Sequence, residues 1–246
     1  MVEFYRRVAR KAVEHHLLID FHGAFKPTGL RREYPNVLTH EGVMGLEYLK
    51  WSARVTPDHN VTIPFTRMLA GPMDYTPGGF NNVTSAEFQP RGREPMTLGT
   101  RAHQLALFVV LESGFTMVAD YPEDYRGEKV LDFISRVPVA WDETRVLEGE
   151  PGKFIAIARR KGNEWYVGCL TGSDARVLQI PLDFLPSGKL FQAEIYSDAP
   201  DAAQFPKKTV KQERAVRGTD VLKVEMVTGG GQAIRIFPAA SVEGRN

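Results

Sequence analysis

In the first part of the chain, apolar positions follow a helical spacing in some segments and run continuously in others. Val2, Tyr5, Val8, Ala12 and His16 share one stripe at helical spacing, which predicts a helix over residues 2–16. Further helices are predicted at 62–69, at 100–113 and within 125–136. Short apolar runs that end in polar or glycine-rich loops predict buried strands at 17–22, 36–41, 71–75 and 115–120. Helices that alternate with short buried strands favour a parallel α/β arrangement.

After Pro138 the pattern changes to short strand-like runs that are separated by turn signals. Leu222, Val224 and Met226 alternate with charged residues, as in a half-buried strand. Strand-like runs occur at 153–160, 164–170, 175–182, 190–197, 207–216, 220–227 and 231–237. Seven short strands at this spacing are typical of an antiparallel β-sandwich. The change of pattern predicts two domains, residues 1–138 and residues 139–246.

Composition and charge exclude several classes of partner. The 31 basic and 30 acidic residues give a formal net charge of +1, which provides no footprint for nucleic acid or for an anionic membrane. No run approaches the roughly 20 apolar residues of a membrane helix, and the first residues lack the apolar core of a signal peptide. The one cysteine, Cys169, lies in an apolar run, so we expect an inert thiol in the core.

Candidate chemistry gathers where the first two predicted strands end. His22 closes one apolar run, Glu41 closes the next, and Glu47 follows across a glycine-containing turn. In a (β/α)₈ barrel, catalytic side chains sit in the loops that follow the strands. Two carboxylates near one pocket can divide the roles of ionised group and proton donor, or bind Ca²⁺ through their oxygen atoms. Surface charge for Glu41 and Glu47, and a structural role for His22, remain the alternatives.

Three aspartates also lie in or at the end of predicted strands. Asp20 alternates with His22, so both should point to the same face, and a buried Asp20 needs a partner such as a neighbouring histidine or Lys26. Asp74 and Asp120 occupy similar places, and on the residues alone a structural role is the better interpretation for each.

Several segments resemble glycoside hydrolase family 97. The similarity is carried by residues 18–32, by Tyr34-Pro35-Asn36, by Pro64-Phe65-Thr66-Arg67 and, most specifically, by the string Gly-Pro-Met-Asp-Tyr-Thr-Pro-Gly at 71–78. The resemblance implies an exo-acting α-glucosidase or α-galactosidase. It also implies the fold class, namely the C-terminal half of a (β/α)₈ TIM barrel followed by an antiparallel β-sandwich. Half a barrel agrees with the four predicted parallel strands.

The resemblance also implies roles for individual residues. Glu47 matches the general acid, which is the acid/base in the retaining branch, and Glu41 matches a calcium ligand; we assign Ca²⁺ to Glu41 and Glu47. Substrate binding is assigned to His22, Lys26 and Asp74. Inverting members carry a glutamate after the strand histidine, where this chain has Gly23, so the chain resembles the retaining branch and more closely the α-galactosidases.

The retaining branch uses an aspartate nucleophile on the preceding barrel strand, which would lie upstream of Met1. We therefore expect this chain alone to be inactive, because a retaining enzyme needs two carboxyl groups roughly 5–5.5 Å apart. The alternative is a non-catalytic module for carbohydrate binding or domain contact. The resemblance further implies an oligosaccharide or simple α-galactoside or α-glucoside as substrate, and a periplasmic or secreted location. A half barrel would expose apolar surface, so self-association into a homo-oligomer is also expected.

Overall fold

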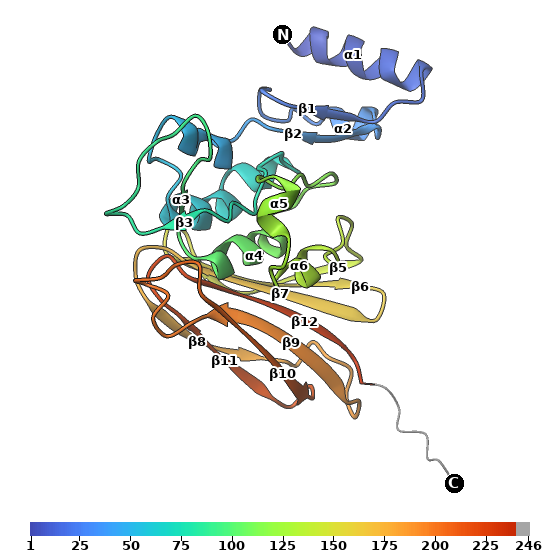
Figure 1. The fold of residues 1–246 in the computed structure, drawn as a ribbon. Coiled ribbons are helices and arrows are strands. Elements are labelled where there is room, and N and C mark those ends of the chain that lie inside the picture. The colour runs from blue at the N-terminus through green and yellow to red at the C-terminus, as the bar shows by residue number, and fades with distance from the viewer. Residues whose placement is uncertain (240–246) are drawn as a thin grey trace.

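The computed structural model describes residues 1–239 and places the N-terminal elements farthest from a large antiparallel sheet (Figure 1). The chain begins with α1 (Val2–Glu14), β1 (Ile19–Phe21), α2 (Leu30–Glu33) and β2 (Val37–His40). β1 and β2 pair in parallel, as the α/β pattern predicts. A small core of Ala9, Phe21, Leu30 and Val37 holds α1 and α2 against this pair.

The segment after β2 is built mostly of short turns of helix. Its elements are η1 (Leu46–Lys50), α3 (Pro57–Thr62), η2 (Ile63–Phe65), η3 (Arg67–Ala70), β3 (Asn82–Val83), β4 (Thr97–Leu98), α4 (Arg101–Val110), α5 (Pro122–Tyr125) and α6 (Leu131–Ile134). Thr56 caps α3, and Thr100 caps α4 by accepting the His103 N–H. The helix predicted at 100–113 is therefore confirmed as α4, with its first residue set by this cap.

Several predictions in this segment are wrong. The predicted strand at 71–75 makes only one bridge, between Met73 and His40, because Pro72 has no N–H to donate. The predicted strand at 115–120 is irregular; its Ala119 N–H donates to Pro77 O instead of to a sheet. The helix predicted at 62–69 forms the 3₁₀ turns η2 and η3. By contrast, the helix predicted within 125–136 is confirmed as the short helix α6. Residues 80–96 contain β3, which pairs in parallel with β4.

The seven strands predicted after Pro138 are all present. They are β6 (Phe154–Lys161), β7 (Glu164–Thr171), β8 (Arg176–Pro181), β9 (Phe191–Asp198), β10 (Thr209–Val216), β11 (Val221–Met226) and β12 (Gly231–Pro238). An eighth strand, β5 (Glu143–Glu150), forms one edge of the sheet. The sequence pattern missed β5 because most of its side chains are exposed and polar.

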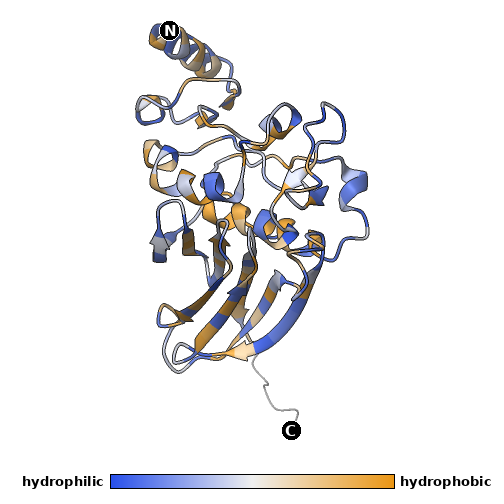
Figure 2. Cartoon of the chain, turned by 90° about the vertical axis from the view of Figure 1, so that its left-hand side faces the viewer, coloured by the Kyte–Doolittle hydropathy of each residue, from blue (hydrophilic) through white to orange (hydrophobic). Residues whose placement is uncertain are grey.

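These strands form a sandwich of unequal layers. Six of them make one antiparallel sheet in the order β10-β9-β12-β7-β6-β5, and the β8–β11 pair covers one face of it. The other face packs against α4, and the hydrophobic residues gather along this contact (Figure 2). The contact is close, since a Cβ on Gly168 would lie 2.8 Å from Ala106 O. Burial on both faces explains why β6 is apolar from Phe154 to Ala158 and β7 from Trp165 to Leu170.

The predicted order, an α/β segment followed by an antiparallel sandwich, is confirmed. Cys169 is buried in β7, and burial raises the pKa of its thiol to about 12, which fits an inert core residue. Among residues 1–239, none of the helices has the length and apolar character that crossing a membrane requires.

Candidate active site

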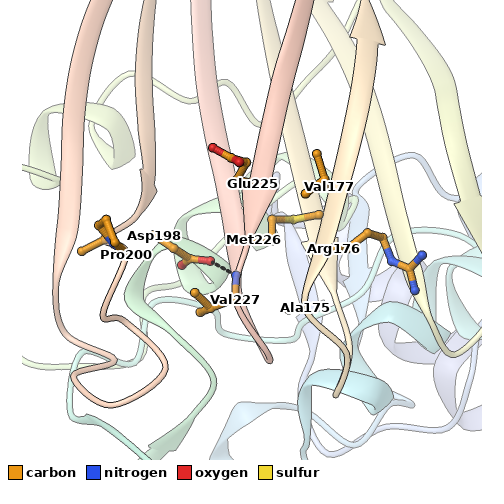
Figure 3. Close-up of a pocket in the computed structure, with 9 residues that line it drawn as sticks. Ala175, Arg176, Val177, Asp198, Pro200, Glu225, Met226 and Val227 are labelled. Atoms are coloured by element: carbon orange, nitrogen blue, oxygen red, sulfur yellow. Dashed lines mark hydrogen bonds between the residues drawn. The ribbon is translucent and has the colours of Figure 1, made fainter.

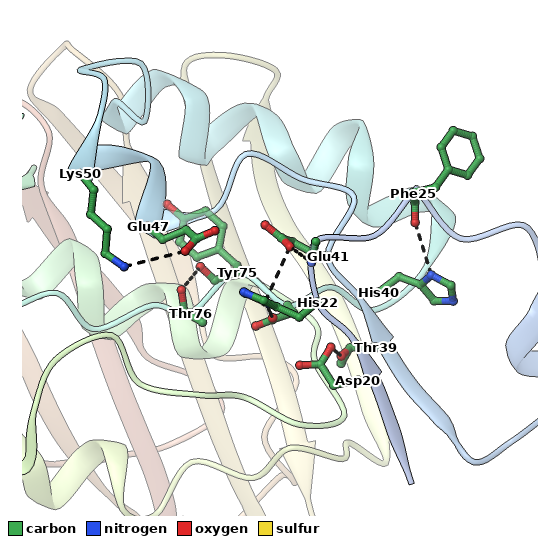
Figure 4. A network of polar contacts seen from close by, with 12 residues as sticks. Asp20, His22, Phe25, Thr39, His40, Glu41, Glu47, Lys50, Tyr75 and Thr76 are labelled. Atoms are coloured by element: carbon green, nitrogen blue, oxygen red, sulfur yellow. Dashed lines mark hydrogen bonds and ion pairs between the residues drawn. The ribbon is translucent and has the colours of Figure 1, made fainter. Parts of the chain in front are cut away.

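Three side chains that the sequence singled out converge from three different elements. His22 follows β1, Glu41 follows β2, and Glu47 lies in η1. One ring nitrogen of His22 and one carboxylate oxygen from each glutamate all lie within 4.8 Å of one another. Figure 4 shows the three side chains turned toward a common point. The arrangement is that expected where adjacent parallel strands end, because their C-terminal ends meet at one edge of the sheet.

His22 is held by two carboxylates. Its Nδ1 lies 2.7 Å from Asp74 Oδ2 and 3.6 Å from Glu41 Oε2. The hydrogen bond that His22 donates to Asp74 raises the pKa of His22, and the negative charge of Glu41 adds to the effect. Asp74 is buried, and burial raises its own pKa. The imidazole and two neighbouring carboxylates therefore share one network, in which His22 remains accessible and Asp74 is buried.

Glu41 is held in place by a backbone N–H of the loop that follows β1. Its side chain is buried and accepts a hydrogen bond from the Gly23 N–H. Gly23 has φ +63°, in the left-handed region that favours glycine. The glycine therefore turns its own N–H toward Glu41 and leaves no side chain between Glu41 and His22.

Glu47 faces a cavity of about 180 Å³. The Leu46 N–H, at the start of η1, donates to Tyr75 O over 3.0 Å and so fixes the turn that carries Glu47. Lys50 lies one helical turn later, with Nζ 3.9 Å from Glu47 Oε2. The cavity is also lined by His22, Thr76, Met117 and Asp120. It combines a few polar groups with apolar walls, as small-molecule sites do.

Two of the predicted residues lie elsewhere or have other partners. Lys26 is exposed, with its ammonium 5.9 Å from the centre of the Phe25 ring, and it does not join the cluster. The partner expected for Asp20, a histidine or Lys26, is wrong: the Thr39 hydroxyl on β2 donates to its carboxylate. A parallel neighbour strand supplies that hydroxyl, and a contact between strands was not visible in local spacing.

Other residues of the cavity were missed or interpreted differently. Asp120 lines the cavity, and its carboxylate accepts the Phe80 N–H over 2.5 Å, while burial raises its pKa. Lys50 was not predicted, although its position three residues after Glu47 on a helical turn was a usable signal. Met117 falls in the segment that was wrongly predicted as a strand.

The donor set can be tested against a bound cation. Glu41 and Glu47 offer carboxylate oxygens, the atoms that Ca²⁺ prefers, at a separation that one ion can bridge. His22 offers nitrogen and is already engaged by Asp74. The two carboxylates fit a hard cation, and the remaining oxygen ligands that Ca²⁺ needs would come from other groups or water.

A larger cavity, of about 440 Å³, lies in the sandwich near the ends of β8, β9 and β11 (Figure 3). Asp198 borders it, but its carboxylate is committed to the Thr100 hydroxyl and to the N–H groups of Val227 and Gly231. The smaller cavity at Glu47 is thus the better candidate, because its acidic and basic groups converge on a shared space.

Comparison with known proteins identifies the family. A model described as glycoside hydrolase 97 matches residues 1–43, and one described as glycosyl-hydrolase 97 C-terminal, oligomerisation, matches residues 140–237. A retaining alpha-galactosidase from Bacteroides thetaiotaomicron is 41% identical over 239 residues, which are 96% of this chain and 36% of the relative. A probable retaining alpha-galactosidase from Streptomyces bingchenggensis is 36% identical over 94% of this chain and 33% of the relative.

Solved structures agree with these matches. A family 97 enzyme from Pseudoalteromonas sp. strain K8, in complex with acarbose, has a TM-score of 0.87 and 40% identity over 96% of this chain and 37% of that chain. A variant in complex with panose matches at the same TM-score. The chain spans about a third of the length of the curated relatives it matches. Together, the matched segments and the shared fold show that the chain belongs to glycoside hydrolase family 97.

Proposed function

We propose that this chain forms part of the active site of an exo-acting, retaining α-glycoside hydrolase that acts on α-galactosides with the help of Ca²⁺. The observation that carries the proposal is the position of Glu47. Its carboxylate is partly exposed, faces the cavity, and lies beside His22 and Glu41. A proton donor for a glycosidic oxygen needs such a place, open to substrate and close to other charged groups.

Glu47 would act as the acid/base. In a retaining hydrolase one carboxylic acid protonates the leaving oxygen, and a second carboxylate attacks the sugar from the opposite face. The first residue then takes a proton from the water that releases the product. Gly23 has no side chain, so it cannot act as the general base that an inverting mechanism needs. We infer that the nucleophile comes from a barrel strand outside residues 1–246, so these residues alone would be inactive.

His22 and Asp74 would bind and orient the sugar. The imidazole of His22 is accessible at the cavity, where it can donate a hydrogen bond to a hydroxyl, and buried Asp74 holds its ring orientation. Lys26 would reach the substrate only at the rim, because it is exposed and outside the cluster. Glu41 and Glu47 would hold Ca²⁺, which supplies fixed positive charge for binding oxygen atoms near the bond that breaks.

Two substrate classes are supported to different degrees. The curated relatives named as retaining alpha-galactosidases, at 41% and 36% identity, favour α-galactosides. The complexes of the Pseudoalteromonas enzyme with acarbose and panose favour α-glucosides as the second candidate. A non-catalytic module is the remaining alternative.

The deciding experiment is hydrolysis of 4-nitrophenyl α-galactoside and α-glucoside by a protein that joins residues 1–246 to an upstream barrel half, with and without Ca²⁺. Cleavage of the galactoside with α-product first, and loss of that activity in Glu47→Gln, would support the proposal. Glu112→Gln is a matched control, because it removes a carboxylate outside the cluster. Glucoside cleavage alone would select the second candidate, and full activity in Glu47→Gln would remove Glu47 from the mechanism.

Assembly and location are further parts of the proposal. The description of the model matched by residues 140–237 includes oligomerisation, which supports a homo-oligomer formed through the sandwich. Sedimentation of the purified chain would show whether it self-associates. A periplasmic or secreted location is proposed from family resemblance alone, and cell fractionation of the source organism would test it.

A further inference from the structure

Arg67 makes an unusual set of contacts beside the candidate site. Its guanidinium donates to five backbone carbonyls: Nε to Gly42 O (3.1 Å), Nη1 to Gly71 O (2.8 Å), and Nη2 to His40 O (2.7 Å), Glu41 O (3.1 Å) and Pro72 O (3.3 Å). Two of these carbonyls, Glu41 and Gly42, directly follow β2, and two more precede Met73. One side chain thus joins the ends of two neighbouring barrel segments.

The charge of Arg67 is neutralised by no carboxylate in the part of the chain described here; its partners are carbonyl oxygens alone. Arg67 is half-buried, and burial lowers the pKa of its guanidinium, because removing the charge from water is unfavourable. Such a cost is offset only if several donors are used, and the planar guanidinium offers five in a fixed fork. Surface solubility or a simple ion pair does not account for this placement.

The contacts matter because the two segments barely pair with each other. His40 and Met73 form the single bridge between them, and the Asp74 N–H reaches His40 O only at 3.3 Å. Beyond that point the segments would be free to splay, leaving carbonyls without donors. Arg67 supplies those donors. The two segments carry Glu41 and Asp74, the carboxylates that face His22.

We propose that Arg67 is a positioning residue that sets the separation of the Glu41 and Asp74 segments and so holds Glu41 at the His22–Glu47 cluster. It does not line the cavity at Glu47, and it acts through the backbone of its partners. The positioning itself is independent of catalysis. Its consequence for cation binding and hydrolysis rests on the proposed function above.

The test compares Arg67→Lys and Arg67→Gln with the wild-type chain by two measurements. The amide of Gly23, which donates to Glu41, is followed by NMR in the metal-free protein. We expect its proton resonance to move upfield and its exchange with solvent to speed at least tenfold in Arg67→Gln, with a smaller change in Arg67→Lys. Binding of Tb³⁺, a probe for calcium sites, should weaken about 10–100-fold in Arg67→Gln, as is usual for residues that support metal ligands.

Arg159→Lys is the matched control. Arg159 is a buried arginine outside the cluster. It donates to Val110 O at the end of α4 and to the Thr144 hydroxyl on β5. Its loss should lower the melting temperature while the Gly23 amide and Tb³⁺ binding stay unchanged. An Arg67 variant that behaves like Arg159→Lys, less stable but with an unchanged Gly23 amide, would reduce Arg67 to a purely structural residue and overturn the proposal.

Two further outcomes are separable. If the wild-type chain binds no Tb³⁺, the calcium part of the proposed function fails, while the Gly23 amide still decides the role of Arg67. If both Arg67 variants fail to fold, the wild-type chain gives the answer through the Nε–H of Arg67, which donates to Gly42 O. Slow exchange of that proton supports the positioning role, and exchange as fast as in an exposed arginine overturns it.

Discussion

The sandwich and the N-terminal layer differ in how completely their strands are paired and buried. In the sandwich, strands such as β6, β7 and β12 are paired on both edges and buried on both faces. In the N-terminal layer, β1 and β2 form a two-stranded parallel pair over a core of four buried residues, and Leu17 and Leu18 are exposed. The N-terminal layer carries side chains of the candidate site, whereas the sandwich has the more extensive strand pairing and burial. The difference indicates that the layer with the candidate site depends on neighbouring parts of the protein for its stability.

The largest effect should come from the sheet. Ile157 is 1% exposed and lies in the core shared by β6 and α4. Replacing it with alanine removes buried methyl groups and leaves a cavity, which should lower the free energy of unfolding by about 2–5 kcal/mol. Urea denaturation followed by the fluorescence of Trp141 and Trp165 measures the change.

Leu18→Ala is the comparison in the N-terminal layer. Leu18 is 70% exposed, so its truncation should change stability by no more than about 0.5 kcal/mol. A loss at Leu18 as large as that at Ile157 would show that this surface is covered in solution, for example by a second copy of the chain, and the contrast between the two regions would disappear.

The contact between α4 and the sheet should give the next largest effect. Asp198 at the end of β9 accepts the Thr100 hydroxyl at the start of α4, over 2.6 Å. Burial raises the pKa of Asp198 from 3.8 to about 6. The folded state therefore binds this proton more tightly than the unfolded state, so its contribution to stability is fully present below pH 4 and is lost as the pH rises through 6.

Asp198→Asn isolates that contribution. The stability of wild type relative to the variant should fall by about 2–3 kcal/mol between pH 4 and pH 7, measured by urea denaturation. Asp201→Asn is a control of opposite sign, because a hydrogen bond from Lys208 lowers the pKa of exposed Asp201. A pH profile that is the same in wild type and Asp198→Asn would exclude a role for Asp198 as a titrating link between α4 and the sheet.

The sandwich could be predicted from sequence because its signals are local. Alternation in β11, the turn glycines and the continuous apolar run of β6 each indicate a strand without reference to distant residues. The edge strand β5 was missed because its polar, exposed side chains resemble a loop. The irregular path of 71–75 and 115–120 was missed for another reason: strand formation there depends on a partner strand, which local pattern does not report.

The candidate site shows the same limit. The positions of His22, Glu41 and Glu47 were readable because each polar residue interrupts or follows an apolar run. Their supporting contacts were not. Asp20 accepts a hydrogen bond from Thr39, and Asp74 pairs with His22, in both cases across 19 or more residues of sequence. Arg67 donates hydrogen bonds to the ends of two segments. Such pairings follow from the three-dimensional arrangement of the strand ends. In the sequence, only the family resemblance indicated that arrangement.

The smallest effect should sharpen the comparison most. Gly23 and Gly162 both have positive φ, +63° and +57°, and a Cβ at either would meet no atom closer than 3.9 Å. Alanine should therefore introduce the same backbone strain, about 1 kcal/mol, in the N-terminal layer and in the β6–β7 turn. In Gly162→Ala this strain should lower the global stability of the sheet.

In Gly23→Ala the global transition should stay unchanged, because the small core of the N-terminal layer opens before the sheet does. Hydrogen exchange measures this directly. Amides of Phe21 and Val37 should exchange about fivefold faster in Gly23→Ala, while those of Val167 and Leu170 in β7 should not change; Gly162→Ala should accelerate the β7 amides instead. If Gly23→Ala also speeds exchange in β7, the two regions unfold as one cooperative unit, and the strain at the candidate site is borne by the whole sheet.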